Sequence, residues 1–291
     1  RTGYGPNWKC GQECSIRVIN ILISLQLSKT IEFPGKSLRE LLSVHLNRID
    51  QTTTYAEAQQ NNHIIAEAVA LMFGSAVIRS DDVFGDRKEF WESKGRVLLE
   101  KSVSKLFDDT GVFSQFSTNY HRLALDYLSI AELLRRSLHR QEFSRVFYTK
   151  LYHASTWLYY LTDSNTGRAP NLGANDGASL FSWLQMDFKD FRYSVGLALE
   201  LFTDKSAFTD DPDLISFFNL LGVNSSEKTC APVKANLFAS NGFKVISFST
   251  WWLCFRTINN RFRSFDSDIL HIDLWHKGQN VLVDGGTYSY A

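Results

Sequence analysis

Residues 235–257, ANLFASNGFKVISFSTWWLCFRT, carry the change in hydrophobic pattern that decides the fold. Apolar and polar side chains alternate through this stretch, and Asn241-Gly242 divides it with a dipeptide typical of tight hairpin turns. The predicted strands are 235–239, 244–250, 252–257, 269–275 and 280–283, divided by Asn241-Gly242, Asn259-Asn260 and Lys277-Gly278. Several short antiparallel strands predict the start of a domain in which one sheet packs on another.

Upstream of this stretch, from Cys10 to about Leu221, the hydrophobic pattern has a helical period almost throughout. The predicted helices are 16–27, 38–50, 62–73, 87–106, 120–138, 142–161, 194–202 and 212–221, with interruptions at Gly74-Ser75, 108–111 and 163–177. Successive helices with short links indicate stacked antiparallel hairpins. We therefore predict an α+β chain, with a helical domain over residues 1–227 and the start of an antiparallel β domain over residues 228–291.

Composition excludes some classes of protein. The 291 residues hold 31 Lys and Arg against 31 Asp and Glu, and there is no basic run, which counts against a nucleic-acid partner. The longest apolar run, Val18 to Leu27, is too short for a membrane span and contains polar residues. Aromatic residues reach 14%, and such side chains fill cores and also line grooves that stack on sugar rings.

Two polar clusters lie at expected helix starts. His63 and Glu67 are four residues apart and share a helix face, behind two Asn residues that make a good N-cap; on spacing alone, a surface pair is the favoured interpretation. Tyr120, His121 and Arg122 follow the cap signal Ser117-Thr118-Asn119. Because consecutive helix residues face different ways, only one or two of the three can reach a common pocket.

A third cluster is the loop 170–177, PNLGANDG. Its Gly and Asn residues permit left-handed backbone and can present amides and carbonyls to a ligand. Loops of this length within a helical domain are often functional, although a plain turn is the alternative.

Taken together, these clusters carry a resemblance to a known family. The motifs are NWKCGQE (7–13) with Ile16-Arg17, Asn62-His63 with Glu67, Tyr120-His121-Arg122, PNLGANDG (170–177), DILHIDLW (268–275) and DGGTY (284–288). In this order and over nearly the whole chain, they resemble the heparinase II/III-like family of polysaccharide lyases. The resemblance implies an incomplete α/α toroid followed by an antiparallel β-sandwich, truncated here. Because family members are longer, we expect the chain to be a fragment.

The resemblance also implies an activity, β-elimination on a polysaccharide that contains uronic acid. Asn62 and His63 would face the sugar carboxylate, as a neutral amide donor or a protonated imidazole. Tyr120 would transfer the proton, with Arg122 or a His as the cationic neighbour that lowers the phenol pKa. Glu67 would orient His63. The substrate-binding residues implied are Glu67, Arg122, Asn171, Asn175 and Asp176.

A metal site is implied in the β domain. Family members place a His where Asp266 stands, and some place another where Ser264 stands. Asp266 and Asp284, with a third ligand beyond Ala291, would hold a divalent metal, zinc or calcium. The resemblance further implies a periplasmic or secreted protein whose partner is an acidic polysaccharide.

Two other functions compete with elimination. The missing β-domain histidines favour a non-catalytic protein that binds acidic polysaccharide in a capsule or exopolysaccharide pathway. Glycoside hydrolysis ranks last, because it needs two carboxylates that flank the bond. The acidic pairs Asp81-Asp82, Asp108-Asp109 and Asp210-Asp211 are interpreted instead as solvated turns.

Overall fold

The computed structural model describes residues 3–182, 187–223, 229–230, 234–257 and 269–286. The chain divides into two compact units. The first comprises Arg1–Leu106 and Tyr127–Phe147, and the second comprises Phe107–Asp126 and Tyr148–Ala291. Two helices, α6 (Thr118–Ser137) and α7 (Arg145–Leu161), contribute residues to both units. The predicted boundary between residues 227 and 228 stays a prediction.

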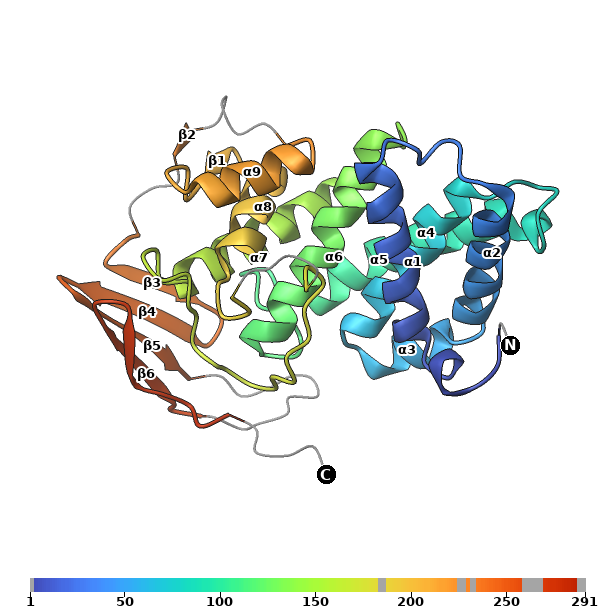
Figure 1. The fold of residues 1–291 in the computed structure, drawn as a ribbon. Helices are drawn as coiled ribbons and strands as arrows, with labels where there is room; N and C mark the ends of the chain where they lie inside the picture. Colours follow the sequence, from blue (N-terminus) through green and yellow to red (C-terminus); the bar gives the residue numbers. More distant parts are fainter. Residues whose placement is uncertain (1–2, 183–186, 224–228, 231–233, 258–268, 287–291) are drawn as a thin grey trace. The chain divides into compact units, whose positions relative to one another are not determined.

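The first unit is helical (Figure 1). Its elements are the 3₁₀ turn η1 (Pro6–Trp8), α1 (Gly11–Leu27), α2 (Lys36–Asp50), α3 (Thr53–Gln59), α4 (Asn62–Val77), the 3₁₀ turn η2 (Gly85–Arg87), α5 (Lys88–Leu106) and the later part of α6. Helix α4 is buried almost throughout and contacts α1, α2, α3 and α5. It is therefore the centre of this unit's core.

Two glycines, Gly95 of α5 and Gly74 of α4, let neighbouring helices pack closely against α4. A Cβ built on Gly95 of α5 would lie 2.5 Å from the backbone nitrogen of Met72, so glycine is needed where α5 crosses α4. The predicted interruption at Gly74-Ser75 is wrong, because α4 continues through both residues to Val77. A Cβ on Gly74 would lie 2.7 Å from Leu46, which shows that this glycine serves helix packing and not a turn.

In the pair Asp81-Asp82, Asp81 is exposed as predicted, but Asp82 is not. Asp82 is buried, and its carboxylate accepts hydrogen bonds from Arg39 Nε and from the Arg79 backbone N–H, each at 2.8 Å. These bonds hold the pKa of Asp82 below its usual range, although burial acts in the opposite direction. The turn that carries Asp82 is therefore bonded to α2, and the interpretation of Asp82 as solvated was wrong.

The second unit combines helices with strands. Besides parts of α6 and α7 it contains α8 (Arg192–Phe202), α9 (Pro212–Leu220) and a short parallel pair, β1 (Lys205–Ser206) with β2 (Thr229–Cys230). The antiparallel sheet runs β3 (Leu237–Ser240), β4 (Phe243–Phe248), β5 (Trp251–Arg256), β6 (Ile272–His276) and β7 (Gln279–Leu282), in that spatial order. Helices followed by an antiparallel sheet confirm the predicted α+β class.

The two faces of the sheet differ. One face buries Phe243, which packs edge-on against Trp157 of α7 at 5.3 Å, and Trp275, which stacks on Trp252 at 4.9 Å. The other face exposes apolar side chains, among them Ile246 and Phe248. The alternation seen in residues 235–257 is thus realised as strand geometry, with Asn241-Gly242 at the β3–β4 turn as predicted. Asn259-Asn260 lies outside the described residues.

No helix of the described part of the chain is both long enough and apolar enough to cross a membrane.

Candidate functional site

The start of α4 holds the first candidate pair. Asn61 is the N-cap, and its side-chain oxygen accepts the backbone N–H of His63 at 3.0 Å, as the sequence indicates. Asn62 is only 2% exposed, whereas His63 is half-buried. Burial lowers the pKa of His63, so its imidazole is neutral at neutral pH. The pair therefore offers a neutral amide and a neutral imidazole, not a cation.

Glu67 lies one turn further along α4 and is 2% exposed. Its carboxylate accepts a hydrogen bond from Thr52 Oγ1 at 3.3 Å, and Gly11 at the start of α1 packs against it; a Cβ there would lie 2.3 Å from Glu67 Oε1. Burial raises the pKa of Glu67 to about 7, against the opposing effects of Thr52, Lys94 and Arg48. In the described structure Glu67 bonds Thr52, and the expected contact with His63 is not formed.

We expect the Glu67→Gln variant to be more stable than the natural chain at pH 8 by on the order of 1 to 3 kcal/mol. The folded pKa of about 7 lies above the unfolded value, so the folded state binds this proton more tightly. The cost of ionising the buried carboxyl is therefore small at pH 5 and grows as pH rises through 7. Urea unfolding at pH 5 and pH 8 measures this difference.

The exposed Glu89 of α5 supplies the control for that experiment. Glu89→Gln should leave the free energy of unfolding unchanged at both pH values. A stability gain in Glu67→Gln of equal size at pH 5 and pH 8 would contradict the raised pKa.

The start of α6 holds the second candidate group, and its three residues point in three directions. The Tyr120 hydroxyl donates a hydrogen bond to Asp176 Oδ2 at 2.7 Å. His121 is 1% exposed, stacks on Trp157 at 4.5 Å, and has its pKa lowered to about 3 by burial. His121 is therefore a neutral core residue, and of these three side chains Tyr120 is the one available for chemistry.

Arg122 is buried in the second unit. Its guanidinium lies over the rings of Phe188 at 4.4 Å and Phe191 at 4.2 Å, and it donates hydrogen bonds to Phe188 O at 2.6 Å and Asn119 Oδ1 at 2.8 Å. These contacts direct the charge away from solvent, and the partner found for the Tyr120 phenol is a carboxylate. The role of Arg122 or a His as the cationic neighbour of Tyr120 stays a prediction.

Asp126 is a buried group that sequence reasoning missed. It is 1% exposed, and burial raises its pKa to about 7 although the charge of Arg122 opposes that shift. The sequence does contain a signal for an interaction between the two residues, because Arg122 and Asp126 are four residues apart on one helix. This carboxyl compensates the buried guanidinium.

The loop 170–177 is attached to the start of α6 by short hydrogen bonds. Ser117 Oγ donates to Ala174 O and Thr118 Oγ1 donates to Pro170 O, each at 2.6 Å, and the Thr118 backbone N–H donates to Leu172 O at 3.1 Å. Gly173 has a φ of 65°, and a Cβ there would lie 2.7 Å from Phe116 O. The loop is therefore held against the start of α6, the helix that carries Tyr120.

Residues 284–286 lie against the same loop. Asn175 Nδ2 donates to Asn171 Oδ1 at 2.7 Å, and a Cβ on Gly286 would lie 2.7 Å from Asn171 Nδ2. Asp284 Oδ1 accepts the Gly286 backbone N–H at 2.6 Å. The second unit thus brings together Tyr120, the loop 170–177 and residues 284–286, which are separated by up to 166 residues in the sequence.

Comparison with known proteins tests the fold of this arrangement. No known sequence family and no curated protein sequence matches the chain. Among solved structures, heparinase III matches with a TM-score of 0.61 at 15% identity, over 96% of this chain and 43% of that one. Heparan sulfate lyase HepC from Pedobacter heparinus matches with a TM-score of 0.57 at 17% identity, over 97% of this chain and 41% of that one.

The chain has a heparinase III-like fold. The predicted resemblance is therefore confirmed for the fold, and with it the order of a helical part followed by a β part. The chain spans less than half the length of these heparinase structures, and at 15 to 17% identity the likeness extends to the fold alone.

Within this heparinase III-like fold, the described residues contain no group of three His, Cys, Asp or Glu side chains that could hold a metal ion. Asp284 uses one carboxylate oxygen in its own turn, and Asp266 lies outside the described residues. The described part of the chain gives no donor set that fits zinc or calcium. The metal site therefore stays a sequence prediction.

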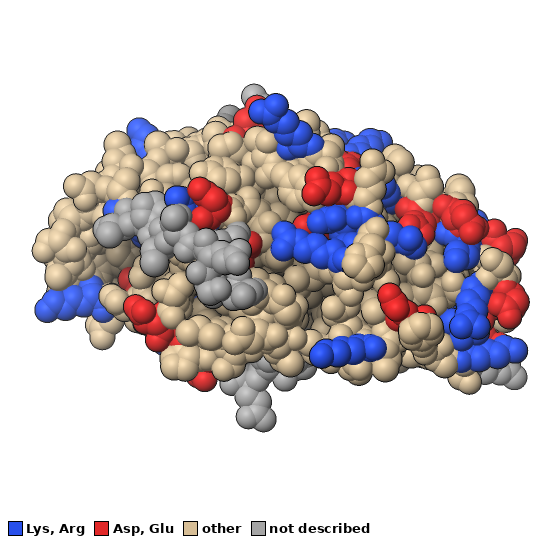
Figure 2. Space-filling view, turned by 90° about the horizontal axis from the view of Figure 1, so that it is seen from above, with Lys and Arg blue, Asp and Glu red and all other residues tan. Residues whose placement is uncertain are grey.

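Charges on the described surface are mixed. Figure 2 shows Lys and Arg side chains on one face with Asp and Glu side chains among them. In α6, for example, Arg135 and Arg136 both bond the carboxylate of Glu132, at 2.8 and 2.7 Å. In such pairs the opposite charges partly cancel each other.

Proposed function

We propose that the chain is the toroid-containing part of a polysaccharide lyase that cleaves a uronic-acid polysaccharide by β-elimination. The heparinase III-like fold supports the lyase class. The single observation that carries the proposal is the 2.7 Å hydrogen bond from the Tyr120 hydroxyl to Asp176, in a loop bonded to the start of α6. This bond gives a surface phenol a fixed direction, which proton transfer requires.

The reaction makes three physical demands. The sugar carboxylate must be neutralised so that the proton on C5 becomes acidic, that proton must be removed, and the departing glycosidic oxygen must be protonated. The C5–H and C4–O bonds break, a C4=C5 double bond forms, and the leaving oxygen gains a proton. No oxidant or reductant is consumed.

Tyr120 is the residue we assign to proton transfer. Asp176 accepts the hydrogen bond of the hydroxyl and can take up its proton, so that the phenol oxygen can accept the proton from C5 and deliver it to the leaving oxygen; the proton held by Asp176 then returns to the phenol. Asp176 positions the hydroxyl. Asn171 and Asn175, bonded to each other in the same loop, are assigned to substrate hydroxyl groups.

Asn62 and His63 are assigned to the uronate group. A buried amide can donate to the carboxylate oxygens as charge moves onto them, and the lowered pKa of His63 supports a neutral imidazole that donates or accepts one hydrogen bond. Arg122 and Glu67, both buried with partners of their own, support the structure around the start of α6 and α4. A periplasmic or secreted location belongs to the same proposal.

The test is the ultraviolet absorbance of the unsaturated uronate, measured with full-length protein over a panel of heparan-type, alginate and exopolysaccharide substrates. Elimination forms the absorbing double bond, whereas hydrolysis and binding do not. Absorbance that grows with time on one substrate supports the lyase. Binding without absorbance across the panel would favour the alternative, a protein that binds acidic polysaccharide without cleaving it.

A further inference from the structure

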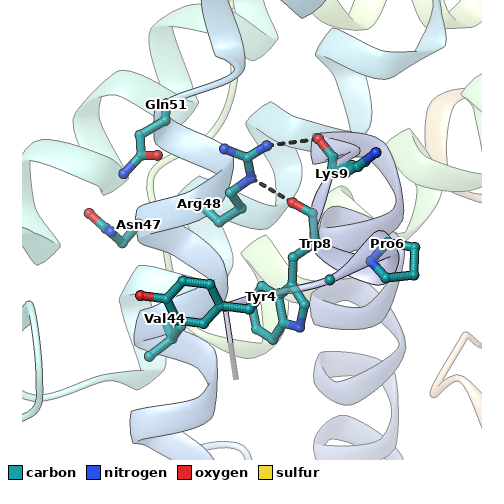
Figure 3. Close-up of a pocket in the computed structure, with 10 residues that line it drawn as sticks. Tyr4, Pro6, Trp8, Lys9, Val44, Asn47, Arg48 and Gln51 are labelled. Carbon is teal, nitrogen blue, oxygen red and sulfur yellow. Dashed lines mark hydrogen bonds between the residues drawn. The ribbon is translucent and has the colours of Figure 1, made fainter. Parts of the chain in front are cut away.

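A hollow lies in the first unit, between the segment before α1 and one face of α2 (Figure 3). Its volume is ≈ 560 Å³, within the range of ligand pockets. The lining residues are Gly3, Tyr4, Gly5, Pro6, Trp8, Lys9, Val44, Asn47, Arg48 and Gln51. Val44, Asn47 and Arg48 occupy positions i, i+3 and i+4 of α2 and share one helix face, and Gln51, at i+7, is the C-cap residue of that helix.

The walls of this hollow are fixed by hydrogen bonds and ring contacts. Arg48 Nε donates to Trp8 O at 2.6 Å and its Nη2 donates to Lys9 O at 2.8 Å, as Figure 3 shows. The Trp8 indole lies 4.3 Å from the His45 ring, with the Arg17 guanidinium 5.6 Å from its centroid. The indole is therefore held in place before any ligand arrives, which reduces the entropy lost on binding.

The lining has the chemistry of a site for an acidic sugar. Tyr4, 75% exposed, and Trp8 present aromatic rings on which a sugar can stack, while Asn47 and Gln51 present amides. Lys9 and Arg48 bring positive charge, and Arg48 uses only two of its five N–H groups on the backbone contacts above.

Among the described residues that line the hollow there is no carboxylate to cancel this charge. Asp50, which follows two residues after Arg48, is bonded instead to Arg87 and Lys94, each at 2.6 Å. The charge of Arg48 also acts on the carboxyl of Glu67, which is buried and does not line the hollow. Lys9 and Arg48, beside two aromatic rings, therefore favour an anionic ligand over a neutral one.

The hollow is joined to the candidate residues of α4. Gln51 precedes Thr52, which bonds Glu67, and Lys9 lies two residues before Gly11, which packs against Glu67. We propose that the hollow is a binding subsite for an acidic sugar unit of the polysaccharide on which the protein acts. The inference rests on the proposed function for the kind of polysaccharide bound. Binding at such a subsite would help to hold the polysaccharide for the reaction.

The test measures binding, so that it is independent of turnover. Octasaccharides of heparan sulfate and alginate, with a neutral dextran octasaccharide for comparison, are titrated calorimetrically into the full-length protein. The variants are Tyr4→Ala and Lys9→Gln, whose side chains are exposed. We expect each to weaken binding of at least one acidic octasaccharide by roughly three- to ten-fold, and Lys9→Gln to flatten its salt dependence.

Matched controls come from the same unit. Tyr55→Ala removes an aromatic side chain that is 69% exposed, and Lys36→Gln removes a lysine that is 72% exposed; neither residue lines the hollow. Both should bind like the natural chain. Unchanged affinity in Tyr4→Ala and Lys9→Gln, equal binding of dextran, or no binding of either acidic octasaccharide would overturn the subsite. Absence of unsaturated product with these affinity losses intact would overturn only the lyase.

Discussion

Replacing Tyr120 by Phe is expected to lower kcat for formation of unsaturated uronate by roughly 10³-fold or more, while affinity for the polysaccharide stays within about two-fold. The substitution removes one oxygen and keeps the ring. It therefore removes the proton that the leaving oxygen would receive, together with the hydrogen bond to Asp176. Product absorbance gives kcat, and calorimetric titration with an uncleaved oligosaccharide gives the affinity.

Two further variants separate this role from a structural one. Tyr152→Phe in α7 removes a hydroxyl from an exposed tyrosine of the same unit and should leave kcat unchanged. Asp176→Asn keeps a hydrogen-bond acceptor but removes the charge, and we expect a smaller loss than in Tyr120→Phe. Full activity in Tyr120→Phe would remove Tyr120 from the mechanism.

Much of the fold could be predicted, because its signals are local. The helical period and the alternation around Asn241-Gly242 each depend on residues close in sequence, and the structure confirms both. The signals that failed depend on distant partners. Gly74 looks like a helix end until Leu46 packs against it, and Asp82 looks solvated until Arg39 reaches it. The short α3 was missed because its seven residues hold little periodic pattern.

The candidate site, like the fold, has features that depend on nearby residues and could be predicted, and features that depend on distant residues and could not. The N-caps at Asn61 and Ser117 were readable from sequence, since a cap bonds residues two or three positions away. The directions of His121 and Arg122 were not, because Trp157 and Phe188 that receive them lie more than 30 residues away. The same distance explains why Asp176, expected only to line the groove, is found bonded to Tyr120.

Replacing His63 by Ala is expected to slow elimination by roughly 10²- to 10³-fold, the size of effect seen when one preorganised donor is lost. Burial lowers the pKa of His63, so the neutral imidazole is the form present at neutral pH. If that form is the active one, kcat/KM falls only when pH drops below a value under 6.5, the ordinary pKa of histidine. The residual activity of His63→Ala should lack this acid limb.

The pH profile also distinguishes between two roles for His63 that would give the same loss of rate in His63→Ala. A protonated imidazole that pairs with the uronate would lose activity as pH rises through the histidine pKa, which is the opposite slope. The half-buried His153 of the second unit gives the control, since His153→Ala removes an imidazole that has no assigned role and should leave both rate and profile unchanged. An unchanged rate in His63→Ala would remove His63 from the mechanism; the surface pair with Glu67 that the spacing first favoured is already excluded, because Glu67 is buried.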